Sequence, residues 1–149
     1  MNKEQIKDEG QLKPKAGDKV TLDGKELTWK EYTAKEHFFD FNDFLGATTE
    51  YSVGYAVVYV VADDDMKDVR MKTGSDDQAR VYLNGKQVLN QPDARPLEKD
   101  QDTTTVSLKK GTNVIVFKVV NEGMDWSGCL RFTDAGGTPL KGLKARLTP

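Results

Sequence analysis

The run YSVGYAVVYVVA, from Tyr51 to Ala62, restricts the fold of this chain more than any other stretch. Its β-branched and aromatic residues favour a β-strand. Apolar side chains occupy both alternating sets of positions, so we expect a central strand with both faces covered. The polar turn DDDMKD follows, and VRMKT then alternates as a strand near the edge of a sheet does.

Two dipeptides with glycine predict tight β-hairpins. Asn84-Gly85 follows a strand in which Ala79, Val81 and Leu83 point the same way, and Asp23-Gly24 separates two short apolar segments. Both dipeptides suit the positive φ angles of a two-residue hairpin turn.

Several further segments have the character of short strands: TTTVSL, TNVIVFKVVN, SGCLRFTD and, as extended chain, TPLKGLKARLTP. The stretch HFFDFNDFLG suits either a short helix or an extended segment pressed against a sheet. About eight or nine strands at short spacing, without a long helix, predict an all-β fold, an antiparallel β-sandwich of the jelly-roll type.

The 149 residues are enough for one domain with a real core. Residues 1–18 are polar, contain Pro14 and Gly17, and have few large apolar side chains. We expect a poorly ordered N-terminal tail over residues 1–18 and a single β-sandwich domain over residues 19–149.

Charge and composition exclude several partners. The chain has 22 basic and 24 acidic residues and a net charge of −2, so it lacks the basic excess that nucleic-acid phosphates require. No apolar run approaches the roughly 20 residues of a membrane span, so no membrane insertion is expected. The polar start predicts no signal peptide, and the single Cys129 excludes an internal disulfide.

The sequence does not predict catalysis. His37 is the only histidine, and Cys129 lies in a strand pattern, where a cysteine acts as a small core residue. One cysteine and one histidine are too few for a zinc site. No nucleophile elbow and no phosphate-binding glycine loop is present, and most aspartates lie in turns, where they cap the backbone. We therefore predict that this protein is not an enzyme.

Two features remain as binding candidates. Trp126, in the polar turn NEGMDWSG, could be a platform for a sugar, whose C–H faces stack on aromatic rings. Its other possible role is to fold back and cover one end of the sandwich. The adjacent pair Asp76-Asp77 could bind a ligand or a metal ion, or could cap the backbone at the start of a hairpin.

The stretches GSDDQARVYLNGKQV and LKKGTNVIVFKVVNEGMDWSGCLRFTDAGGTPL carry a wider pattern of turns and strands. From Tyr51 onward, over about 100 residues, this pattern resembles the galactose-binding-like jelly-roll domains of bacterial β-galactosidase-type and β-glucuronidase-type glycoside hydrolases. It is also similar to domains of multidomain exported proteins of planctomycete-like bacteria. The chain departs from the pattern at Gln78 and Ser127, where members of the family often have glycine.

The resemblance implies a non-catalytic carbohydrate-binding module of a larger exported bacterial protein, secreted, periplasmic or on the cell surface, with other domains of that protein as partners. Weak sugar binding would use an exposed aromatic ring and polar loop residues. The candidate ligand-binding residues are Trp126, Asp76, Asp77, Asp125, Asn84, Arg95 and Arg131. A related protective-antigen-type sugar-binding domain uses adjacent aspartates to hold calcium, so Asp76 and Asp77 are also the candidate calcium ligands; no other cofactor is expected.

The alternative is a structural or protein-interaction module with no sugar ligand. Exposure of Trp126 together with polar side chains on one concave surface would favour the sugar module. Burial of Trp126, with Asp76 and Asp77 both bonded to backbone donors, would favour the alternative.

Overall fold

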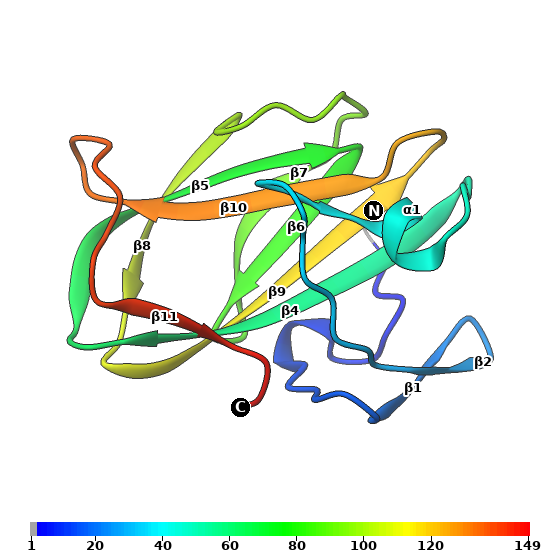
Figure 1. The fold of residues 1–149 in the computed structure, drawn as a ribbon, viewed down its shortest axis with the longest axis horizontal. Helices are drawn as coiled ribbons and strands as arrows, with labels where there is room; N and C mark the ends of the chain where they lie inside the picture. Colours follow the sequence, from blue (N-terminus) through cyan, green and yellow to red (C-terminus); the bar gives the residue numbers. More distant parts are fainter. Residues whose placement is uncertain (1–2) are drawn as a thin grey trace.

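Two antiparallel β-sheets packed against each other form the body of the protein (Figure 1). The computed structural model describes residues 3–149. One sheet has four strands in the order β3-β10-β5-β8, and the other has five in the order β11-β4-β9-β6-β7. The predicted all-β antiparallel sandwich is therefore confirmed.

The strands of each sheet have the following residue ranges. The four-stranded sheet contains β3 (Phe39–Asp40), β5 (Met66–Asp76), β8 (Asp102–Leu108) and β10 (Ser127–Thr133). The five-stranded sheet contains β4 (Ser52–Ala62), β6 (Gln78–Leu83), β7 (Lys86–Gln91), β9 (Gly111–Asn121) and β11 (Leu143–Arg146). A separate hairpin, a 3₁₀ turn and a short helix complete the fold: β1 (Lys19–Leu22), β2 (Lys25–Thr28), η1 (Glu9–Gln11) and α1 (Phe41–Leu45).

The strand order is that of a jelly roll. With β3 counted as the first strand and β10 as the eighth, the sheets read one-eight-three-six and two-seven-four-five, and β11 is added beside β4. The chain consequently changes sheets at every connection from β3 to β11 except the β6–β7 hairpin. These crossings place the connections at the two ends of the sandwich.

Both predicted hairpins are present. Leu83 pairs with Lys86 across Asn84-Gly85, and Leu22 pairs with Lys25 across Asp23-Gly24. All four turn residues have positive φ angles, as a tight hairpin requires.

The phenylalanine-rich stretch adopts both of the conformations that its sequence allows. Phe39–Asp40 pairs with β10, and α1 begins immediately afterwards. The Asp40 carboxylate accepts hydrogen bonds from the N–H groups of Asn42 and Asp43 and so caps the helix. Gly46 ends the helix in the left-handed conformation. Among the described residues, no helix is long and apolar enough to span a membrane.

Alternation along the strands builds the core between the sheets. Val81 of β6, Phe117 of β9 and Met71 of β5 are all almost completely buried there. β9 is buried on both faces, because its outward-facing residues are also covered. The same holds in part for β4, where Tyr59 is buried on the outer face.

The N-terminal segment covers this outer face, which corrects the expectation of a poorly ordered tail over residues 1–18. Met1 and Asn2 lie outside the described residues, but Ile6 is 6% exposed and Glu9 is completely buried. The Tyr59 hydroxyl donates to the carbonyl oxygen of Pro14. The segment is therefore part of the fold.

A buried charge explains why this polar segment is held. Lys118 projects from the outer face of β9, is completely buried, and donates to the Glu9 carboxylate at 3.0 Å. The hydroxyls of Tyr55 and Tyr82 also donate to Glu9, and an Arg80 Nη1 atom lies 3.5 Å from it. Burial alone would raise the pKa of Glu9, but these hydrogen bonds and the charge of Lys118 outweigh it and lower the pKa.

We predict that Glu9→Gln lowers the free energy of unfolding by about 3–5 kcal/mol, because it leaves Lys118 buried without a counter-charge. Chemical denaturation of the variant and of the exposed control Glu4→Gln measures the difference. Because the folded-state pKa of Glu9 lies below its ordinary value of 4.5, the difference is fully present above pH 4.5 and shrinks as the pH falls below it. Equal stability of the two variants at pH 7 would contradict this assignment.

Candidate functional site

The acidic pair forms the corner at which the chain passes from one sheet to the other. β5 ends at Asp76 and β6 begins at Gln78, so Asp77 alone makes the crossing. The Asp77 N–H donates to the Val120 carbonyl at 3.3 Å, and its carboxylate accepts from the Glu122 N–H at 2.8 Å. Asp77 therefore fixes the crossing to the end of β9.

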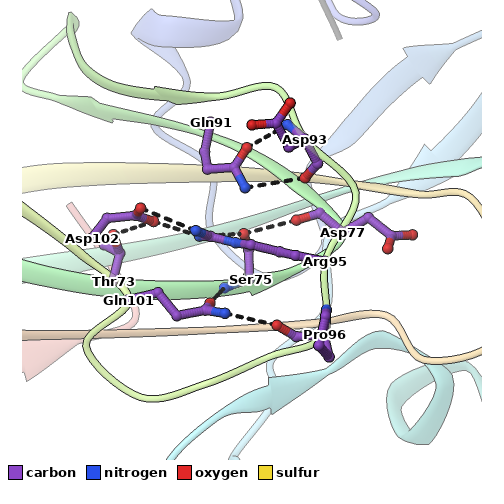
Figure 2. Close-up of polar contacts among 9 residues, drawn as sticks. All are labelled: Thr73, Ser75, Asp77, Gln91, Asp93, Arg95, Pro96, Gln101 and Asp102. Atoms are coloured by element: carbon purple, nitrogen blue, oxygen red, sulfur yellow. Dashed lines mark hydrogen bonds and ion pairs between the residues drawn. The ribbon is translucent and has the colours of Figure 1, made fainter.

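Arg95 supports the same corner from a long loop, residues 92–101 (Figure 2). The Ser75 hydroxyl donates to the Asp77 carbonyl at 2.8 Å and accepts from Arg95 Nη2 at 3.1 Å. Arg95 also binds both carboxylate oxygens of Asp102, and Gln101 accepts from the Ser75 N–H at 3.0 Å. The guanidinium thus attaches the loop to β5 and is not free for a ligand.

Asp76 is the most perturbed acid of the corner. It is 9% exposed, and burial raises its pKa to about 7, with further contributions from the charge of Asp77, a hydrogen bond with Asp77 and the charge of Asp125. A backbone hydrogen bond from Leu97 acts in the opposite direction. Near neutral pH, Asp76 therefore holds a proton for much of the time.

Two features of the corner bear on the expectation that Asp76 and Asp77 hold calcium. Calcium prefers several ionised oxygen ligands. One Asp77 oxygen already accepts the Glu122 N–H, and the raised pKa of Asp76 opposes its charged form. Over residues 3–149, no group of three or more His, Cys, Asp or Glu residues is placed to hold a metal ion.

Trp126 is buried, so the expectation of an exposed sugar platform at this residue is wrong. It is 4% exposed, and its ring stacks on Phe41 with centroids 4.6 Å apart. Its Nε1–H donates to the Val119 carbonyl at 3.2 Å. Gly54 makes room for the two rings, since a Cβ there would lie 2.6 Å from Phe41 and 2.8 Å from Trp126. Trp126 covers one end of the sandwich, the other role that its sequence context allowed.

Two of the remaining candidates also have internal partners. Asn84 donates to the Asn113 side chain at 3.0 Å and accepts from the Val114 N–H at 2.9 Å. Arg131 donates two hydrogen bonds to Asp100, at 2.9 and 2.6 Å. Both arrangements tie a loop or a hairpin to a strand.

The structure gathers only some of the seven candidate residues. Asp76 and Asp77 lie near the exposed Asp125, and Arg95 joins them through Ser75. Asn84 lies at the opposite end of β6, and Arg131 is paired with Lys72 within the sheet.

A cavity of about 350 Å³ is a second candidate site, and the sequence did not predict it. It opens under residues 29–38, which we call the strap and which cross from β2 to β3 in Figure 1. Its other walls include residues 55–58 of β4, residues 128–130 of β10, residues 14–16 of the N-terminal segment and Leu147, which directly follows β11. Its aromatic lining includes Trp29, Tyr32, Phe38, Phe39, Phe41 and Phe117. The run of aromatic residues between 29 and 44, without strand or helix periodicity, is the signal that could have indicated it.

His37 and Cys129 both border this cavity. No hydrogen bond joins them in the described part of the chain, where His37 is exposed and Cys129 is buried. Burial raises the pKa of the Cys129 thiol, which disfavours the reactive thiolate.

Exposed apolar side chains do occur at the end of the sandwich that carries Asp76, Asp77 and Asp125, which we call the acidic end. Tyr51, just before β4, is 86% exposed, and Met124, in the turn before Trp126, is 76% exposed. Ser52 pairs with Asn121, which brings the segments that carry these two residues together. Tyr51, and not Trp126, therefore has the exposed aromatic ring that a sugar platform needs.

No protein-family model, no curated protein and no solved structure matches this chain. The resemblance to galactose-binding-like domains consequently remains a prediction from the residues that carry it.

We predict that Asp76→Asn stabilises the protein at pH 8, by on the order of 1–3 kcal/mol. The folded state holds the Asp76 proton up to about pH 7, whereas the unfolded chain loses it near 3.8, so wild-type stability falls as the pH rises between these values. Asparagine removes that dependence. Urea denaturation at pH 4 and pH 8 measures it, with Asp64→Asn, exposed in the turn between β4 and β5, as the control. An Asp76→Asn variant with unchanged pH dependence would contradict the assignment.

We also predict that Trp126→Ala lowers the free energy of unfolding by about 3–5 kcal/mol, as expected for a large aromatic residue removed from a core. Thermal or chemical denaturation measures the loss, and Met124→Ala, in the same turn but exposed, should change stability by less than about 0.5 kcal/mol. A neutral Trp126→Ala substitution would mean that the ring is not part of the core.

Proposed function

We propose that this chain is a non-catalytic β-sandwich module that works through contacts with proteins and not through a sugar site. The observation that carries the proposal is the burial of Trp126, stacked on Phe41 and hydrogen-bonded to Val119. Without that ring, the expected sugar site loses its stacking surface.

The polar candidates support the same proposal. A sugar site needs donors and acceptors that are free to meet hydroxyl groups. Asp77 accepts the Glu122 N–H, and Arg95 and Arg131 are paired with Asp102 and Asp100. Asn84 is used at the other end of the sandwich. These side chains hold loops in place, which is what a rigid spacing or docking module needs.

The resemblance described above suggests where such a module would act. We propose a domain of a larger exported bacterial protein, whose neighbouring domains or associated proteins are its partners. The single buried cysteine and the balanced charge are compatible with that setting.

A carbohydrate-binding module remains the second candidate, and one observation favours it. Tyr51 is 86% exposed at the end of the sandwich that also carries Asp125 and Glu122. An exposed tyrosine beside acids offers both a stacking face and acceptors for hydroxyl groups. Any sugar contact would then centre on Tyr51 in place of Trp126.

The two candidates predict opposite results in a sugar titration. We expect no saturable change in tryptophan fluorescence or in ¹H–¹⁵N NMR shifts when a panel of mono- and oligosaccharides is added, with or without calcium. A saturable change that is lost in Tyr51→Ala, and kept in the control Met124→Ala, would replace our proposal with the sugar module. A response that requires calcium would additionally implicate Asp76 and Asp77.

A further inference from the structure

The edge of β4 is only partly paired. β11 pairs with β4 from Leu143 opposite Ala62 to Arg146 opposite Tyr59. Beyond Tyr59, residues 55–58 of β4 border the aromatic cavity under the strap. Four consecutive residues line the cavity although their side chains alternate between two faces, so the cavity lies along the edge of the strand.

The direction of the backbone groups follows from one hydrogen bond. The Asp63 N–H donates to the Gly142 carbonyl at 3.0 Å, on the side of β11. Because backbone groups alternate sides along a strand, the odd-numbered residues of β4 face that side. The N–H and C=O groups of Tyr55 and Val57 therefore face the cavity. In the part of the chain that the structure describes, no backbone hydrogen bond joins them to the strap.

The opposite wall is also a strand edge. The carbonyls of Trp126 and Phe132 accept from Phe41 and Leu140 on the outer side of β10. Leu130 lies between them and is two residues before Phe132, so its backbone groups face the same way. Over residues 3–149, its backbone forms no hydrogen bond to the strap. Two strand edges thus border one apolar cavity.

The side chains around the cavity leave room for an incoming residue. Ala56 and Val58 are the inward-facing residues of β4 at this edge, and both are small and half-buried. Directly paired residues of neighbouring strands point to the same face of a sheet. A residue opposite Ala56 would therefore direct its side chain into the cavity, towards Phe117.

We infer that the edge of β4 from Tyr55 to Val58 is a docking site for an extended peptide segment of a partner protein. The peptide adds as an antiparallel strand in line with β11 and places an apolar side chain in the aromatic cavity. This inference rests on the proposed function as a protein-interaction module. Backbone pairing supplies the affinity, and the cavity supplies the selectivity.

The chemistry of the walls identifies this occupant. N–H and C=O groups at strand spacing are matched by another extended backbone. The cavity volume of about 350 Å³ is at the low end for small-ligand pockets, which suits a few apolar side chains. Lys15, Lys30, Glu31 and Glu36 border the cavity with both signs of charge, so no strongly charged partner is selected.

Two substitutions test the two halves of the site separately. Val57→Pro removes an N–H that faces the cavity and leaves the pairing with β9 intact, since proline is tolerated where the N–H of an edge strand is unpaired. Ala56→Phe fills the cavity from within. Val57→Thr keeps the shape and the N–H, and is the matched control. Near-UV circular dichroism and thermal unfolding establish that each variant is folded, and either Val57→Pro or Ala56→Phe suffices for the test.

The probe is a phage-displayed library of random nonapeptides, selected on the wild-type protein. We expect enriched peptides with apolar residues at alternate positions. Fluorescence anisotropy of the best peptide, labelled with fluorescein, should show binding weakened at least about tenfold by Val57→Pro and by Ala56→Phe. Val57→Thr should bind within about twofold of wild type. Methylating the peptide nitrogens that face β4 should abolish binding, whereas methylating the alternate nitrogens should not.

Failure of this inference and failure of the proposed function give different results. If no peptide is enriched, or if Val57→Pro and Ala56→Phe bind as wild type does, the docking site on β4 is overturned. If the sugar titration also gave no saturable response, the proposed protein-interaction function would remain, and its partner would bind at another surface. A saturable sugar response at Tyr51 would overturn the proposed function itself.

Discussion

The buried charge of Lys118 is the constraint on which the rest of the structure depends. A lysine in the middle of the most buried strand costs stability unless a carboxylate pairs with it and other donors complete the site. Glu9 provides that carboxylate, and the hydroxyls of Tyr55 and Tyr82 donate further hydrogen bonds to it. The N-terminal segment must therefore lie across the five-stranded sheet, and the sheet is covered on both faces.

This cover determines which surfaces remain for function. The outer face of the five-stranded sheet is occupied by the segment around Glu9, and the inner face by the core. At the acidic end, the crossing at Asp77 uses the polar groups that a ligand would need. At the apolar cavity between β4 and β10, backbone edges and space for side chains occur together.

The sequence predicted the parts of the fold that depend on local signals. Asn84-Gly85 and Asp23-Gly24 form the predicted hairpins, and the apolar run from Tyr51 to Ala62 contains β4 (Ser52–Ala62), which is covered in part on both faces. The long-range partners could not be predicted in the same way. Nothing near Trp126 in the sequence shows that Phe41 and Gly54 make a place for its ring.

The N-terminal segment had a signal that points beyond local patterns. Lys118 interrupts the apolar run VIVFKVVN, and a lysine there requires a buried acid from elsewhere in the chain. The sequence contains 24 acidic residues, so it indicates that Lys118 needs an acidic partner but does not identify that partner as Glu9. The aromatic residues of the strap are a similar case. Their number predicts that they pack against the sandwich, but it does not predict the cavity between them.

An unpaired strand edge beside an apolar cavity can bind a partner, but it can also cause aggregation. Such an edge can pair with any other exposed strand and lead to aggregation. The strap crosses this edge and carries Lys30, Glu31, Lys35 and Glu36, all exposed. A charged segment over the edge hinders a second sheet more than a single extended peptide, because a sheet would bring its own neighbouring strands against the strap. The same segment that forms one wall of the cavity thereby limits which partners can reach it.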